Sequence, residues 1–311
     1  MRWARLPMAL LAVLAVCLAH RVVRACAGEL AGYAWLLLCI ANGYLRLHLV
    51  RAMCEAPLVA CCVLGLWVMS RTLTRFRSAT AAPLWRALAA TAVFGVITGL
   101  ATSSKLNGLA LLGPGGLMIV VVTVLLRPRL RRPIVFFIAA VLVLLGATAL
   151  TVLALNPYLW PAPLAHFAEL YRMRLHTMSE QISSATKAAI GTLQRRMIVV
   201  PRKVLQISAS ISDSNTAPTT FYVNALLLAV GLFWLIRQAL GVMRRQPWNP
   251  AALAILLVGG IVSFPALLTP LDWERYYVLP VFFSTMAIAI ALAWLAQRVL
   301  ASTDSVSSSR E

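Results

Sequence analysis

Three short polar segments, each lying between long apolar runs, carry the side chains most suited to chemistry. The first reads RLHLVRAMCEAP over residues 46–57 and offers Arg51 and Glu55. These two residues are four apart, so they share one face if the segment is helical. The carboxylate of Glu55 is a candidate for taking or orienting the proton of a hydroxyl nucleophile, and Arg51 is a candidate phosphate ligand. The same spacing also suits an internal ion pair, with Glu55 stabilised by the positive end of the following helix.

The second segment, ATSSKLNGLALL over residues 101–112, contains one charged side chain, Lys105. Ser103, Ser104 and Asn107 flank it in the sequence. A lone ammonium group among hydroxyls and an amide suits a phosphate, so Lys105 and Asn107 are candidate phosphate ligands. A lysine at the end of an apolar run can equally extend toward lipid headgroups, and that alternative role is structural.

The third segment, LTPLDWERYYVLP over residues 268–280, crowds charged and aromatic residues between two apolar runs. Asp272 is the second candidate acid. Arg275 presents the planar donor pair that matches phosphate oxygens, and Tyr276 is placed beside it as a binding residue. The alternative for the tyrosine is an ordinary position in the aromatic belt at a membrane surface.

A longer polar stretch, residues 158–219, opens with helical periodicity and predicts an amphipathic helix over 163–178 that lies on the outer membrane interface. Its apolar positions are Leu164, Phe167, Tyr171, Leu175 and Met178. Arg172 and His176 occupy its polar side and join the candidate binding residues. His166 and His176 are not spaced as a metal pair. We therefore expect no metal site and no cofactor, although a divalent metal stays open.

The apolar runs themselves define the class of fold. Of 311 residues, 61% are apolar and 12% are charged, whereas a soluble protein carries roughly 25% charged residues. Runs of about 15–25 apolar residues predict membrane-spanning helices, so we expect an all-α, polytopic transmembrane helix bundle. The net charge of +19 comes from arginines between the runs, which orient helices and meet anionic lipid rather than nucleic acid.

Nine apolar runs are candidate spans. They cover residues 6–19, 30–45, 56–69, 83–101, 106–126, 133–157, 220–236, 250–269 and 277–296. The first run is short enough to be a signal peptide, but Arg21 and Arg24 follow it and favour a short membrane helix. We divide the chain into N-terminal membrane helices over 1–157, an external loop over 158–219, C-terminal membrane helices over 220–296 and a cytoplasmic tail over 297–311.

The distribution of basic residues predicts the orientation. Placing segments 20–29, 70–82, 127–132, 237–249 and the tail in the cytoplasm puts fourteen arginines there and six basic residues in the short external segments. We expect a multi-pass protein, in the inner plasma membrane if the host is bacterial. Nine spans then leave the basic N-terminus outside, which an intact chain rarely exports. The expectation is that a helix and a loop of a longer protein precede Met1.

Four phrases resemble a known family. They are RAMCEAPL at Arg51–Leu58, GLATSSKLNG at Gly99–Gly108, NPYLWP at Asn156–Pro161 and DWERYYVLP at Asp272–Pro280. The phrases, their order along the chain and their location on one predicted side resemble those of the C-type membrane glycosyltransferases that use polyprenyl-phosphate sugars. Protein O-mannosyltransferases and the aminoarabinose transferase of lipid A belong to that group. The resemblance covers about residues 30–296.

The resemblance implies that sugar moves, with inversion, from a polyprenyl-phosphate donor to an acceptor protein or glycolipid outside the cytoplasm. In the family that the sequence resembles, the first external loop supplies an acidic residue. This sequence has no acidic pair near its start. Its only early acid, Glu29, falls on the predicted cytoplasmic side. Glu55 and Asp272 are the remaining external acids, and Arg51, Lys105 and Arg275 are expected to hold the phosphate.

Two alternatives stay open. The chain could be an inactive fragment or an accessory membrane subunit of the same fold, which would have the same helices but no turnover. A lipid or solute transporter would place charges within its spans or contain paired broken helices, whereas the candidate charges here lie at one rim of the bundle.

Overall fold

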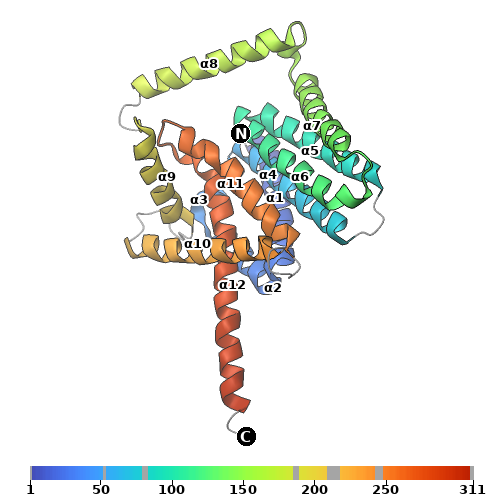
Figure 1. Cartoon of the computed structure of the whole chain (residues 1–311). Coiled ribbons are helices and arrows are strands. Elements are labelled where there is room, and N and C mark those ends of the chain that lie inside the picture. Colours follow the sequence, from blue (N-terminus) through green and yellow to red (C-terminus); the bar gives the residue numbers. More distant parts are fainter. Residues whose placement is uncertain are drawn as a thin grey trace.

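The computed structural model describes residues 2–51, 54–78, 83–184, 189–208, 218–241 and 248–308, and within them the chain is all-α (Figure 1). The α-helices are α1 (Arg2–Ala27), α2 (Glu29–Ala41), α3 (Gly43–Val50), α4 (Glu55–Ser78), α5 (Leu84–Ser104), α6 (Leu112–Leu126), α7 (Pro133–Leu155), α8 (Pro163–Ser184), α9 (Leu193–Ser208), α10 (Pro218–Ala239), α11 (Pro250–Leu268) and α12 (Val278–Ser308). Short 3-10 helices include η1 (Leu106–Leu111), η2 (Arg127–Arg129), η3 (Pro157–Leu159) and η6 (Glu274–Tyr276).

Eight of the described helices are long and apolar enough to cross a membrane. A ninth span results if α2 and α3 are counted together, although these two helices bend by 73° at their junction. The predicted helical bundle is therefore confirmed, and its second span, expected over 30–45, is a broken one. The cause is at Asn42, whose extended backbone separates the two helices while its side chain accepts a hydrogen bond from the Leu45 amide.

The first span is longer than the sequence indicated. The run over 6–19 continues as helix through Arg21 and Arg24 to Ala27. Residues 20–27 include no proline or glycine that would end the helix. The helix ends before Gly28, which adopts a positive φ of 88°. The expected cytoplasmic loop over 20–29 is thus mostly helix, and Arg24 pairs with Glu29 of α2 at 2.7 Å.

The core of the bundle lies between α4 and α12, whose apolar windows are the most buried of the candidate spans. Trp35 of α2 packs edge-on against Phe282 of α12, with ring centroids 5.5 Å apart. Helices α5 and α7 approach closely because Gly95 carries no side chain: a Cβ there would lie 2.7 Å from the Leu144 carbonyl oxygen. Helix α5 also packs against α4, and the end of α5 lies beside the start of α4.

Helix α8 confirms the helix predicted over 163–178 and extends it to Ser184. It contains no buried residue, and in Figure 1 it runs across one end of the molecule, apart from the bundle. None of its apolar residues is fully covered, although Phe167 and Met178 are partly buried. This agrees with an interfacial position, which stays a prediction.

Helix α9 lies in the stretch expected to be an external loop and was not predicted. Its C-terminal residue, Ser208, is completely buried. The last carbonyls of α9 accept hydrogen bonds from Asn42 at 2.7 Å, to Ile207, and from Thr285 of α12 at 3.0 Å, to Ser208. Donors from two other helices therefore satisfy the end of α9, and residues 158–219 are not wholly outside the bundle. The segment expected to be the tail begins as helix, because α12 continues to Ser308.

Candidate functional site

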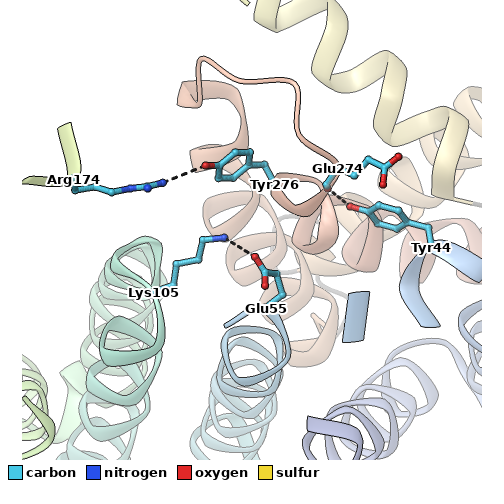
Figure 2. Close-up of polar contacts among 6 residues, drawn as sticks. All are labelled: Tyr44, Glu55, Lys105, Arg174, Glu274 and Tyr276. Atoms are coloured by element: carbon cyan, nitrogen blue, oxygen red, sulfur yellow. Dashed lines mark hydrogen bonds and ion pairs between the residues drawn. The ribbon is translucent and has the colours of Figure 1, made fainter. Parts of the chain in front are cut away.

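Two of the predicted polar segments meet at one end of the bundle, where α4 begins and α5 ends. Glu55 is the first residue of α4, and Lys105 separates α5 from η1. Figure 2 shows the Lys105 side chain directed at the Glu55 carboxylate, and Lys105 Nζ lies 3.2 Å from Glu55 Oε1. Only 4% of the Glu55 side chain and 16% of the Lys105 side chain are exposed. The pair is therefore largely shielded from water, where charges interact more strongly than on a surface.

The expected pairing of Arg51 with Glu55 on one helix face is wrong. Arg51 ends α3 with an extended backbone, and α4 starts only at Glu55. The side chain of Arg51 is exposed and is not among those that line the pocket described below. The sequence spacing suggested a shared face because it assumed one continuous helix through residues 51–55.

The third segment adds a cation and an aromatic ring from η6. The guanidinium carbon of Arg275 lies 4.5 Å from the centroid of the Trp273 ring and 5.4 Å from that of Tyr276. Lys105 Nζ is 5.1 Å from the same Tyr276 centroid. Tyr276 thus contacts two cations, and each contact is a favourable cation–π arrangement. Arg275 makes no ion pair among the described residues.

A small pocket joins these groups. Glu55, Lys105, Asn107, Arg275 and Tyr276 line it together with apolar residues of α4, α11 and α12. Its free volume of about 20 Å³ is enough for one water molecule. Two polar atoms of its lining residues, Glu55 Oε2 and Arg275 Nε, are buried and have no hydrogen-bond partner among the described residues. Since orphaned buried polar atoms are costly, this pocket suits a polar occupant that supplies both a donor and an acceptor.

Asp272, the other candidate acid, is engaged elsewhere. Its Oδ1 accepts a hydrogen bond from the Tyr277 hydroxyl at 2.7 Å, and its Oδ2 lies 2.6 Å from Lys203 Nζ of α9. It does not line the pocket. The structure therefore leaves Glu55 as the carboxylate of the candidate site.

Helix α8 approaches the pocket through a residue that the sequence analysis missed. Arg174 donates a hydrogen bond to the Tyr276 hydroxyl at 3.2 Å (Figure 2). The predicted Arg172 and His176 are exposed and lie outside the pocket, and His176 pairs with Glu180 at 3.5 Å instead. Periodicity identified the helix, but it could not tell which of its basic residues faces the bundle.

Further contacts hold the segment that bears Arg275. The Tyr44 hydroxyl of α3 donates to the backbone carbonyl of Glu274, and the Glu274 carboxylate lies 3.7 Å from His48 Nε2 (Figure 2 shows the first contact). Tyr44 and His48 were not singled out from the sequence, because only the bend between α2 and α3 brings them to η6. Within the described ranges, no three His, Cys, Asp or Glu side chains are grouped to hold a metal ion.

No known family model matches the sequence, and no curated protein matches it either. The resemblance to membrane glycosyltransferases therefore remains a prediction based on four short phrases. The fold defines the class of protein: the chain is a polytopic helical membrane protein with eight candidate spans, or nine with the bent pair, among the residues described. A polar pocket at one end of this bundle is its candidate site.

Proposed function

We propose that this protein is a glycosyltransferase that moves a sugar from a polyprenyl-phosphate carrier to an acceptor protein or glycolipid on the non-cytoplasmic side. The observation that carries the proposal is the pair of unpartnered buried atoms, Glu55 Oε2 and Arg275 Nε, in one pocket. A carboxylate oxygen for an acceptor hydroxyl and a guanidinium for a phosphate are the two groups that this reaction requires.

The proposed reaction assigns each group one role. Arg275 and Lys105 neutralise the phosphate as the bond between the sugar C1 and the phosphate oxygen breaks, and the bond electrons leave with the polyprenyl phosphate. The acceptor hydroxyl oxygen forms the new bond to C1. Its proton goes to Glu55 Oε2, the oxygen that Lys105 does not contact. Asn107 orients the phosphate from the rim of the pocket.

Tyr276 and Arg174 cover the pocket in this proposal. The free volume admits one water molecule but no sugar phosphate. Donor binding therefore displaces the Tyr276 ring and exchanges its contacts with Lys105 and Arg275 for contacts with phosphate. The polyprenyl chain enters sideways between helices, because it is as apolar as the lipid around it. Cofactors have no part in these steps.

A second candidate rests on the Glu55–Lys105 ion pair. A carboxylate already neutralised by a lysine is typical of a structural contact. That arrangement favours an inactive or accessory subunit with the same fold, whose pocket holds water and which transfers no sugar. The two candidates differ in turnover.

The experiment is sugar transfer in membranes that contain labelled polyprenyl-phosphate sugar and the full chain. The wild-type protein is expected to transfer label to protein or glycolipid. Arg275→Ala is expected to lower the rate by about 10²–10³-fold, the usual effect of removing one group that stabilises transition-state charge. Arg202→Ala, at an exposed position of α9, is the matched control. Unchanged transfer by Arg275→Ala contradicts the assigned site, and no transfer by wild type favours the accessory subunit.

A further inference from the structure

A second and larger hollow lies between α4 and α5, far from the candidate site. Its volume of about 620 Å³ is within the range of small-molecule sites, about 300–1,000 Å³. Arg71 and Arg75 of α4 line it, and they are 16 and 20 residues beyond Glu55 on the same helix. At 1.5 Å per residue, about 24–30 Å separates them from the candidate site. The hollow is therefore separate from the pocket of the proposed function and shares no lining residue with it.

Three arginines converge on this hollow. Arg71 and Arg75 are one helical turn apart, and Arg86 enters from the first turn of α5. The guanidinium carbon of Arg71 lies 5.6 Å from the Trp67 ring centroid, and that of Arg86 lies 5.5 Å from the Trp85 centroid. The indole rings thus hold two of the cations in place.

No carboxylate among the described residues forms an ion pair with these three arginines. The connecting residues 79–82 read Ala-Thr-Ala-Ala and contain no acid. All three arginines are exposed, so water weakens their mutual repulsion without removing it. An anion in the hollow removes the repulsion.

The start of α5 adds further positive charge. Pro83 precedes the helix, no side chain caps it, and its first turn contains no acidic residue. The first backbone N–H groups of a helix have no partner within the helix, and they carry the positive end of its dipole. The Arg86 N–H donates to the Pro83 carbonyl at 3.1 Å, which leaves the N–H groups of Leu84 and Trp85 at the same end of the bundle as the arginines. Helix and side chains therefore favour the same ligand charge.

The wall of the hollow is apolar away from the arginines. Val68, Ala90 and Val93 line it, and Val93 is 49% exposed on the surface of a candidate span. Trp85 is 64% exposed beside it, as is usual for tryptophan at the level of lipid headgroups. A ligand that fits both parts has a phosphate head and an apolar tail. We propose that this hollow binds one anionic phospholipid, with its phosphate among Arg71, Arg75 and Arg86 and an acyl chain along Ala90 and Val93.

The test uses the purified full chain in mixed micelles, with phosphatidylglycerol as probe and bound lipid counted by native mass spectrometry. Arg71→Gln/Arg75→Gln/Arg86→Gln is expected to bind about 100-fold more weakly, since each basic residue beside a lipid headgroup contributes about fivefold. The matched control is Arg127→Gln/Arg131→Gln/Arg132→Gln, which removes equal charge around η2. The alternation of α5, α6 and α7 places η2 at the same end of the bundle. The control is expected to keep the bound lipid.

Equal loss of lipid in both triple variants overturns the proposal, because the effect then belongs to the basic rim as a whole. Inorganic phosphate is the second probe. If it stabilises the wild-type protein as strongly as phosphatidylglycerol does, the proposal is overturned, because the lipid tail then contributes nothing. If the triple variant does not fold, the single variant Arg86→Gln replaces it. This variant is expected to bind phosphatidylglycerol about fivefold more weakly than the wild type. Unchanged binding by that folded variant contradicts the site.

Discussion

Glu55 and Lys105 form an ion pair of 3.2 Å that joins the first residue of α4 to the residue at which α5 ends. The pair fixes two sides of the candidate pocket at once. It uses one oxygen of the carboxylate and leaves Oε2 buried without a partner. The contact therefore connects two spans and leaves the second carboxylate oxygen without a partner.

Breaking this pair is expected to destabilise the protein. Glu55→Gln or Lys105→Met leaves the other partner poorly solvated, so each single variant should lose about 3 kcal/mol of unfolding free energy. The double variant should lose clearly less than the sum of the two. Thermal unfolding in detergent measures all three variants. Additive losses would show that the two side chains act independently.

Arg174 is expected to hold α8 over the pocket, since α8 buries none of its own residues. Arg174→Met removes the hydrogen bond to the Tyr276 hydroxyl. A hydrogen bond from a charged group contributes about 1.5–3 kcal/mol, so amide exchange in α8 should become about tenfold faster or more. Hydrogen-exchange mass spectrometry measures this change. Arg172→Met is the matched control, and equal exchange in both variants would contradict the role of Arg174.

The junction between η3 and α8 should weaken only at high pH. Tyr158 donates to Glu169 Oε2 at 2.5 Å, and this hydrogen bond raises the pKa of Tyr158 above its usual value of 10. Below pH 10 the phenol is protonated in both the folded and the unfolded chain, so its contribution to stability is complete. That contribution is lost as the pH rises through the raised pKa. Absorbance at 295 nm, compared between wild type and Tyr158→Phe, follows this titration.

Glu169→Gln is the control for that shift. Without the carboxylate, the pKa of Tyr158 should fall back toward the value of a free tyrosine. A phenol that titrates at the same pH in wild type and Glu169→Gln would exclude the hydrogen bond as the cause.

The orientation is tested by labelling in sealed cells. Ser184→Cys at the end of α8 and Ala301→Cys near the end of α12 are placed in a background without native cysteines. The basic-loop count predicts that an impermeant reagent marks only position 184 from outside. Exclusive labelling of position 301 would reverse the orientation and move the candidate site to the cytoplasmic face.

Composition and run length were sufficient to predict the helical class and most spans, because a membrane imposes long apolar helices. The first helix is longer than its apolar run: the run stops at residue 19, but the helix continues past two arginines and ends before Gly28, whose φ is positive. Helix α9 was missed because its burial depends on donors from distant residues such as Asn42 and Thr285.

The candidate site was predictable only in part. Lys105, Asn107, Arg275, Tyr276 and Glu55 were identified individually because polar residues at the ends of spans are few, and the structure brings them together. Arg51 and Asp272 do not line the pocket. Arg51 lies elsewhere because α3 ends there with an extended backbone, and Asp272 is paired with Lys203 of α9. Neither feature can be inferred from local spacing.

Binding of a polyprenyl phosphate tests the central claim most directly, because it requires neither the sugar nor the acceptor. The probe is labelled farnesyl phosphate, titrated into the purified full chain in detergent. Arg275→Gln is expected to bind at least about tenfold more weakly than wild type, because a charged hydrogen bond to phosphate is lost. Arg202→Gln on α9 should bind as wild type does. Equal affinity of all three proteins would contradict a phosphate site at Arg275, and with it the proposed transferase.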